Sequence, residues 1–291
     1  MRITSAHLAA QVTAATTRAE QRLSTASDVA SSGLRVQVPS DDVVAWSAAQ
    51  RDKLRQTLGA GQGAAISTST TALEQTDGAL STIADAVSKA RQLAVQGSSD
   101  SNASQRGDLG VQVQALFQAA LSAANTQGSD GAYLLAGAQT SSAPFDATGA
   151  YHGDATTRSV ADSEHGSDAV SVSGTALTAA SGVDILPALS QLATALQAND
   201  PAGIQASLGA LTTASTQLGS AREHAGIGLA ALSDADGARQ TLATNLSASV
   251  SKLVEADAVG AISDLAQATT ALQTSQAVSS NVLSSLSKLI S

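Results

Sequence analysis

The sequence has no cysteine, few aromatic residues and few charged ones. Without cysteine the chain forms no disulfide, thiolate metal site or thiol nucleophile. Aromatic residues make up 2% of the 291 positions, so any core must be built from Ala, Leu, Val and Ile, which favours long, thin helical packing. Charged residues account for 13%, about half of the usual share of roughly 25%, and such a weakly charged surface suits contact with other proteins.

The charge balance and the short hydrophobic runs argue against two classes of partner. The formal net charge is -9 and no cluster of Lys and Arg is present, so nucleic acid is not an expected partner. No apolar run approaches the roughly 18 residues that cross a bilayer, so no membrane insertion is expected. The opening Met1-Arg2-Ile3-Thr4 lacks the apolar region of a secretory signal, and we expect no cleaved signal peptide.

Residue types that carry catalytic or metal chemistry are scattered along the chain. The histidines are His7, His152, His165 and His224. Only His152 and Asp154 have even a loose ligand spacing, and we interpret all four histidines as surface residues. The run from Gly59 to Gly63 lacks the Gly-Lys-Ser/Thr of a phosphate loop, and no Gly-x-Ser-x-Gly elbow occurs. We therefore predict no catalytic residue, metal site or cofactor and a protein that is not an enzyme, with an enzyme site in the middle of the chain as an alternative.

The N-terminal part of the chain shows helical periodicity with a clear interruption. Small or apolar residues at steps of four and three predict a helix over residues 4–30. Ser31-Ser32-Gly33 ends this helix, because glycine adopts a positive φ at little cost. Pro39-Ser40-Asp41-Asp42 is a helix start signal, in which we expect Ser40 or Asp41 to cap the next helix.

Two further helices are predicted before residue 128. One covers residues 42–97 and carries a heptad pattern of small and apolar residues, typical of a coiled-coil seam. The seam consists of Leu73, Thr76, Leu80, Ile83, Val87, Ala90 and Ala94. Gly59, Gly61 and Gly63 oppose a regular helix, so we expect a kink or a thinned contact there. The next helix covers about residues 104–127.

Composition changes between residues 128 and 183, where Gly, Ser, Thr and Asp dominate. The alternation Ala169-Val170-Ser171-Val172-Ser173 predicts a small β insert with loops, which we expect to contribute little to the helical seams. Helix resumes near Asp184, and Asp200-Pro201 is a second start signal. The last predicted seam consists of Ile262, Leu265, Thr269, Leu272, Gln276, Ser279, Leu283, Leu286 and Ile290.

The predicted fold is mainly α. The N- and C-terminal segments form a long antiparallel coiled-coil helical rod, with a small β-rich insert in the middle. We divide the chain into an N-terminal axial helix and bend (1–40), a helical rod (41–145), the β/loop insert (146–183), a second helical rod (184–255) and a C-terminal axial helix (256–291). Because the terminal seams are rich in Ala, Ser, Thr and Gln, we expect both ends to order only when neighbouring subunits surround them.

Several segments resemble the bacterial flagellin superfamily. Ser31 to Asp42 is similar to the bend of that family, and the form Pro39-Ser40-Asp41-Asp42 is similar to its hook-filament junction proteins. Further similar segments are Met1-Arg2-Ile3, Ala90 to Gln96, Ala124-Asn125-Thr126, Gly131 to Gly137, Pro144-Phe145, Asp257 to Ile262 and Leu286 to Ile290. A filament flagellin is expected to open with Asn-Thr-Asn and to carry Ala-Lys-Asp-Asp at the bend. The resemblance covers about residues 1–145 and 205–291.

The resemblance implies a secreted structural protein of the bacterial flagellum that adapts the hook to the filament and so serves motility. It implies a homo-oligomeric ring, with hook-associated protein 1 below and flagellin above. It also implies a flagellar export chaperone before secretion, and type III export to the extracellular flagellum. A flagellin-type filament subunit and an Ala-rich amphipathic protein of a granule surface remain as alternatives.

The candidate assembly residues come from the bend and from the C-terminal seam. In the bend they are Ser32, Gly33, Leu34, Arg35, Pro39, Ser40, Asp41 and Asp42. In the C-terminal seam they are Leu265, Leu272, Leu283, Leu286 and Ile290.

Overall fold

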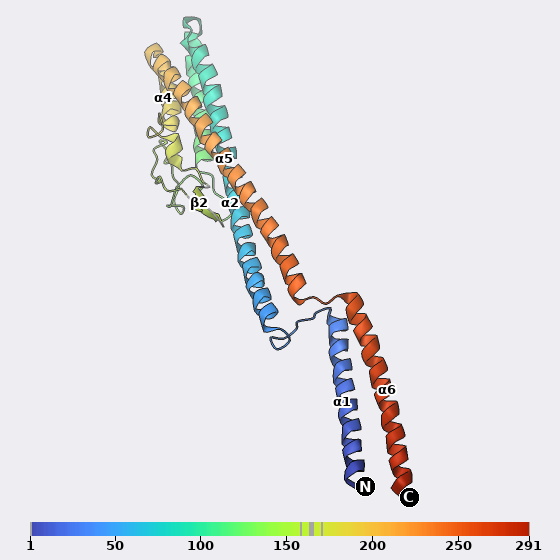
Figure 1. The fold of residues 1–291 in the computed structure, drawn as a ribbon. Coiled ribbons are helices and arrows are strands. Elements are labelled where there is room, and N and C mark those ends of the chain that lie inside the picture. Colours follow the sequence, from blue (N-terminus) through green and yellow to red (C-terminus); the bar gives the residue numbers. More distant parts are fainter. Residues whose placement is uncertain (1, 158, 163–165, 170, 291) are drawn as a thin grey trace. The chain divides into compact units, whose positions relative to one another are not determined.

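The computed structural model describes residues 2–157, 159–162, 166–169 and 171–290, and most of them are helical (Figure 1). The long helices are α1 (Arg2–Ser32), α2 (Val43–Ser98), α3 (Arg106–Ala124), α4 (Ile185–Gln197), α5 (Pro201–Val254) and α6 (Ala258–Ile290). Short 3-10 helices cover η1 (Asp100–Gln105) and η2 (Gly174–Leu177). The prediction of a mainly α chain with long helices is confirmed. Within the described residues, no helix combines the length and the apolar character that a membrane crossing needs.

The chain forms two compact units. The terminal unit consists of Met1–Gly59 and Leu242–Ser291, and the central unit consists of Ala60–Thr241. In the terminal unit α1 and α6 lie side by side, with the N- and C-termini at the same end of the pair, so the two helices are antiparallel (Figure 1). Helix α2 continues without interruption through Gly59, Gly61 and Gly63.

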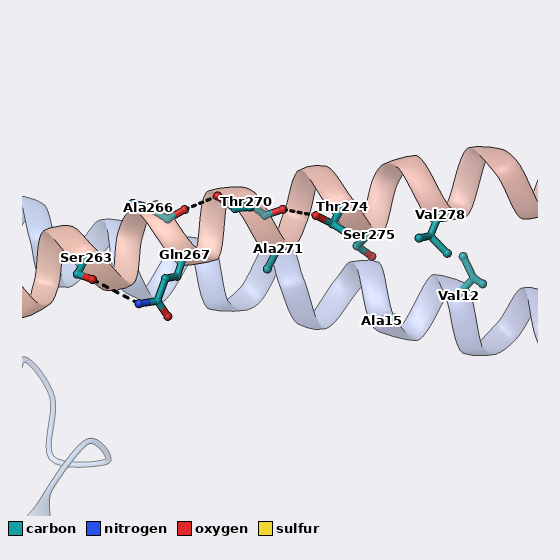
Figure 2. A pocket seen from close by; sticks show the side chains of 10 residues that line it. All are labelled: Val12, Ala15, Ser263, Ala266, Gln267, Thr270, Ala271, Thr274, Ser275 and Val278. Carbon is teal, nitrogen blue, oxygen red and sulfur yellow. Dashed lines mark hydrogen bonds between the residues drawn. The ribbon is translucent and has the colours of Figure 1, made fainter.

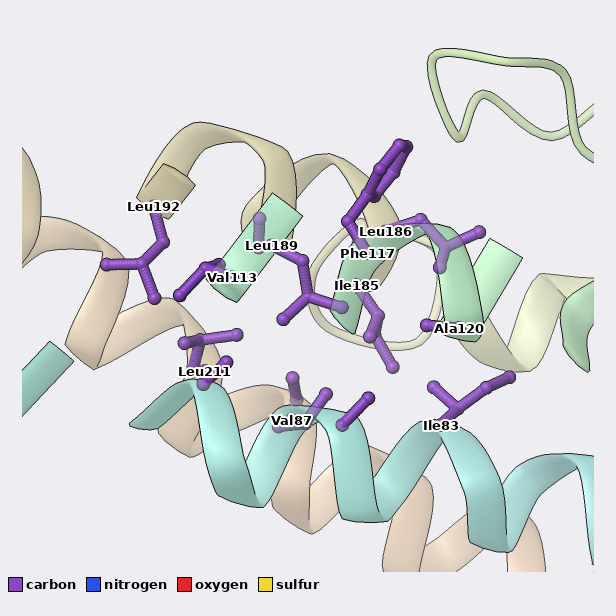
Figure 3. Packing of buried hydrophobic residues seen from close by; sticks show 14 of the residues in the cluster. Ile83, Val87, Val113, Phe117, Ala120, Ile185, Leu186, Leu189, Leu192 and Leu211 are labelled. Carbon is purple, nitrogen blue, oxygen red and sulfur yellow. The ribbon is translucent and has the colours of Figure 1, made fainter. Parts of the chain in front are cut away.

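The core of the central unit is built from aliphatic side chains of four helices. Every member of the predicted heptad seam in α2, from Leu73 to Ala94, is buried. The seam residues from Leu80 to Ala94 pack in one cluster with Val113 and Phe117 of α3, Leu189 of α4 and Leu211 of α5 (Figure 3). Long aliphatic side chains interdigitate with alanines here, so the helices pack closely. Helix α3 contributes one aromatic side chain, Phe117, to this core.

The start of α5 follows the sequence signal. Pro201 is its first residue, and the Asp200 carboxylate accepts a hydrogen bond of 3.1 Å from the Ala202 N–H. Proline at this position loses no helical hydrogen bond, because the first N–H groups of a helix have no partner within it.

The prediction of a β-rich insert is wrong. Within the described part of residues 146–183, strand structure is limited to the antiparallel pair β1 (Ser159–Asp162) and β2 (Gly166–Ala169). Side-chain carboxylates satisfy much of the remaining backbone. Asp146 Oδ1 accepts the N–H groups of Thr148 and Ala150, and Asp154 Oδ1 accepts that of Thr156. Aspartates that bind nearby backbone N–H groups favour turns over extended ladders.

The same segment also belongs to the core of the central unit, contrary to our expectation. Leu177 is 1% exposed and packs in the same cluster as the α2 seam. The Gly174 N–H donates to the Leu135 carbonyl at 2.8 Å. Gln217 of α5, which is itself buried, accepts the Val183 N–H and donates to the Ala176 carbonyl, both at 2.9 Å. The insert is therefore bonded to the helices on which it lies.

Replacing Leu177 with alanine should lower the free energy of unfolding by about 2 to 5 kcal/mol, because it removes a fully buried side chain and leaves a cavity. Urea unfolding followed by circular dichroism measures this loss. Val111→Ala is the matched control, since Val111 is 64% exposed in α3 and its truncation should change little. Equal, small effects of the two variants would mean that the insert is not part of the core.

Candidate assembly interface

The bend begins where α1 ends at Gly33. Gly33 has a φ of +69°, and its N–H donates to the Val29 carbonyl at 2.9 Å. A Cβ at this position would meet no atom within 4 Å, so the requirement for glycine comes from the backbone conformation and not from space. This left-handed residue turns the chain out of the helix.

Beyond Gly33 the chain is bonded to the connection between α5 and α6. Leu34 pairs with Glu255 in an antiparallel bridge. The Arg35 N–H donates to the Val254 carbonyl at 2.7 Å, and the Ala256 N–H donates to the Gly33 carbonyl at 2.9 Å. These backbone bonds join two segments more than 200 residues apart in the sequence. The Arg35 guanidinium adds a bond of 2.8 Å to the Leu253 carbonyl.

Pro39, Ser40 and Asp41 form a tight turn. The Asp41 N–H donates to the Val38 carbonyl at 3.1 Å, and Pro39 holds the second position, where its fixed φ suits the turn. The Asp41 carboxylate accepts the N–H groups of Gln37 and Val38 at 2.9 and 3.0 Å. Asp41 therefore closes the turn.

The residue that caps α2 is Asp42, and not Ser40 or Asp41 as expected. Asp42 Oδ1 accepts the Ala45 N–H at 2.9 Å, in the manner of an N-cap. Asp41 does not reach the helix because its carboxylate is bound within the turn. The adjacent acids thus have different roles, because Asp41 closes the turn and Asp42 caps the helix.

Hydrogen bonds lower the pKa of both carboxylates of the bend. The N–H groups of Val38 and Gln37 hold the pKa of Asp41 below its ordinary value. For Asp42 the Ala45 N–H lowers the pKa most, with a further contribution from Arg35, whose Nη1 lies 3.4 Å from Oδ2. Both acids therefore have structural roles in the bend.

An apolar cluster next to the bend was not predicted from the sequence. Val36 is 2% exposed and packs with Ala45, Ala49 and Val254. The sequence feature that could have revealed this cluster is the alternation of Val36 with the polar, exposed Arg35 and Gln37. Such alternation is typical of an extended segment with one buried side. The cluster anchors the bend on α2 and the end of α5.

Helix α6 turns a different face toward α1 than the sequence predicted. Leu265 and Leu272 are half-buried, as expected for a seam, but Ile262, Thr269 and Gln276 are exposed. The inward positions are Ala261, Leu265, Ala268, Leu272, Ser275, Ser279 and Val282. Small residues such as Ala261 and Ala268 allow the two backbones to approach, and Ile262 lies outside this contact. The side chains of Leu283, Leu286 and Ile290 lie outside the described ones.

The α1–α6 pair is loosely packed. The hydroxyls of Thr16 and Ser275 lie 3.0 Å apart. A groove of about 780 Å³ runs along the pair, and Val12 and Val278 face each other across it (Figure 2). Val278 remains 50% exposed and Ile262 65% exposed. The pair therefore presents apolar surface that its own two helices do not cover.

The structure holds no candidate metal site in its described residues, where no three His, Asp or Glu side chains come together. The ring of His152 lies 2.9 Å from Asp146 Oδ2, and not next to Asp154. The Asp154 carboxylate instead accepts backbone N–H groups from Ala138 and Thr156. The side chain of His152 is 62% exposed, which agrees with its interpretation as a surface residue.

Comparison with known proteins identifies this architecture. Residues 3–140 match the bacterial flagellin N-terminal helical region. No curated protein matches the whole sequence significantly. Among solved structures, a putative flagellar hook-associated protein from Vibrio parahaemolyticus superposes with a TM-score of 0.67 at 19% identity, over 74% of this chain and 100% of that one.

Two further structures have the same fold. Flagellar hook-associated protein 3 from Legionella pneumophila has a TM-score of 0.62 at 16% identity, over 70% of this chain and 98% of that one. FlgL from Xanthomonas campestris has a TM-score of 0.60 at 16% identity, over 70% and 99%. Residues 3–140 thus match the bacterial flagellin N-terminal helical region, and the chain has the fold of these flagellar hook-associated proteins.

Proposed function

We propose that the chain is hook-associated protein 3, the structural subunit that joins the flagellar hook to the flagellin filament. The observation that carries this proposal is the antiparallel α1–α6 pair, which leaves apolar residues such as Ile262 and Val278 uncovered beside a firmly bonded bend. Uncovered apolar surface on this scale is typical of a subunit that is completed by its neighbours. The fold shared with hook-associated proteins supports the same assignment.

The proposed mechanism is mechanical. Copies of the chain form a ring in which the α1–α6 pairs pack against one another, with hook-associated protein 1 below and flagellin above. The bend residues Ser32 to Asp42 set the direction in which the chain leaves α1. Leu265, Leu272, Leu283, Leu286 and Ile290 belong to the proposed assembly helix. An export chaperone shields the chain before type III secretion to the extracellular flagellum.

A flagellin-type filament subunit is the alternative favoured by the family match of residues 3–140. A cell that lacks this chain distinguishes the two functions. If the chain forms the junction, flagellin is still made and exported but accumulates in the medium, with bare hooks on the cell. If the chain is the filament subunit, no other filament protein is released.

The exposed apolar residues of α6 should be needed for attachment and not for folding. Ile262→Ser with Val278→Ser should leave the thermal midpoint of the purified chain unchanged, because the side chains are 65% and 50% exposed. In cells the same variant should release flagellin into the medium. Val111→Ser with Ile227→Ser, at residues 64% and 61% exposed in the central unit, is the matched control and should support normal filaments. Normal filaments from both variants would contradict the proposal.

The bend should tolerate asparagine at residue 33 but not valine. Asparagine adopts a positive φ more readily than other non-glycine residues, whereas a β-branched residue there is strained by about 1 to 3 kcal/mol. Gly33→Asn should therefore swim nearly as the parent does in soft agar, and Gly33→Val should spread poorly. Equal spreading by the two variants would show that the left-handed residue at the bend is dispensable.

A further inference from the structure

One face of α2 in the terminal unit is exposed and has both apolar and basic residues. The face consists of Val44, Ser47, Arg51, Leu54, Arg55 and Leu58, which we name the α2 stripe. At 3.6 residues per turn these positions fall within roughly 100° of one another. The aliphatic members are 78%, 60% and 62% exposed for Val44, Leu54 and Leu58. Neither the bend nor the α1–α6 pair uses this face.

The opposite side of the same helix segment is the packed one. Ala45 and Ala49 are buried there against Val36 and Val254. Asp52, at the edge of the packed side, accepts a hydrogen bond of 2.8 Å from Ser249. The stripe is thus a separate surface on a helix that is already anchored.

The basic residues of the stripe are weakly paired. The Arg55 guanidinium lies 3.9 Å from Asp52, and its side chain is 69% exposed. Arg51 has no ion pair within the described residues, and the stripe itself contains no acid. Two arginines are therefore available to an acidic partner.

Charge is segregated between the two units of the chain. The terminal unit contains nine Lys and Arg against eight Asp and Glu, a formal charge of +1. The central unit contains six against sixteen, a formal charge of -10. Exposed acids of the central unit include Glu74, Asp85, Asp108, Glu223 and Asp234. A central unit with a charge opposite to that of the stripe is thus present on every copy of the chain.

We infer that the α2 stripe is an interface between copies of this chain, and that it docks on the acidic central unit of a second copy. The inference rests on the proposed ring and names a contact within it. Exposed aliphatic residues supply the area to bury, while Arg51 and Arg55 steer and orient the acidic neighbour. The central units, which repel one another through like charge, are each met by a stripe of opposite sign.

Cross-linking tests the identity of the occupant directly, because the chain has no cysteine of its own. Ser47→Cys on the stripe is labelled with a thiol-reactive photo-crosslinker in the full chain. Lys53→Cys, an exposed position on the same helix but outside the stripe, is the control. A mixture of isotopically light and heavy chains at high concentration separates links between copies from links within one.

The expected product is a light–heavy link from residue 47 to a peptide of the central unit, with little product from residue 53. A link to terminal-unit peptides, or none between copies, would overturn the inference. The same cross-linking is repeated with purified flagellin added, to test flagellin as the partner of the stripe. A link from residue 47 to flagellin in place of a second copy would assign the stripe to another partner and overturn it as well.

Charge reversal measures the electrostatic part of the contact. Arg51→Glu should weaken self-association in sedimentation experiments by at least about tenfold at low salt, and Lys53→Glu, with the same change of charge, should have a much smaller effect. Added salt should weaken the parent's association as it screens the pairing. Equal effects of the two reversals, or association that strengthens with salt, would contradict the inference.

Experiments in cells distinguish a failure of the stripe interface from a failure of the proposed junction function. If Arg51→Glu with Arg55→Glu gives normal filaments, the stripe is not an interface and the inference fails, while the proposed junction function stands. If cells lacking the whole chain still attach their filaments, the junction function fails, and the cross-link of the purified chain still decides the contact between copies.

Discussion

The terminal unit depends on a short stretch of backbone pairing between the bend and the α5–α6 connection. Arg35 and Val254 on one side, and Ala256 and Gly33 on the other, exchange hydrogen bonds of 2.7 and 2.9 Å. Because these bonds join the two places where the chain leaves α1 and enters α6, they bring the terminal helices side by side. The pairing is a backbone contact, so it specifies this geometry without bulky side chains.

The composition of the α1–α6 pair explains why the two helices, although side by side, still expose apolar surface. Alanine and serine at Ala261, Ala268 and Ser275 allow close approach but bury little area each. The larger residues Ile262 and Val278 remain at least half-exposed. Stability within one chain is therefore limited, and the surface left over favours association. A contact rich in Leu, such as that made by α4, would instead bury its apolar surface within one chain.

The central unit is built from the same few residue types, but it buries its apolar seam completely. Its α2 seam is fully buried because α3, α4 and α5 surround it, and the loops that cross it are bonded through polar groups. The Tyr151 hydroxyl lies 3.0 and 2.8 Å from the carbonyl oxygens of Leu135 and Asp154. Such bonds satisfy loop backbone that has no ladder partner. The insert is thus irregular in structure and nevertheless part of the core.

Sequence by itself determined the features that depend on neighbours along the chain. These are the α2 heptad, the Asp200-Pro201 helix start and the break at Gly33, together with the resemblance to flagellin, which the family match confirms for residues 3–140. Tertiary structure decided which acid caps α2, which face of α6 turns inward, and how residues 146–183 pack. The last two depend on a competition between distant groups, and the first depends on which acid is bound within the turn. Asp41 is occupied by the turn, alanines fit closer to α1 than Ile262 does, and Gln217 binds loop carbonyls that a hairpin would have paired.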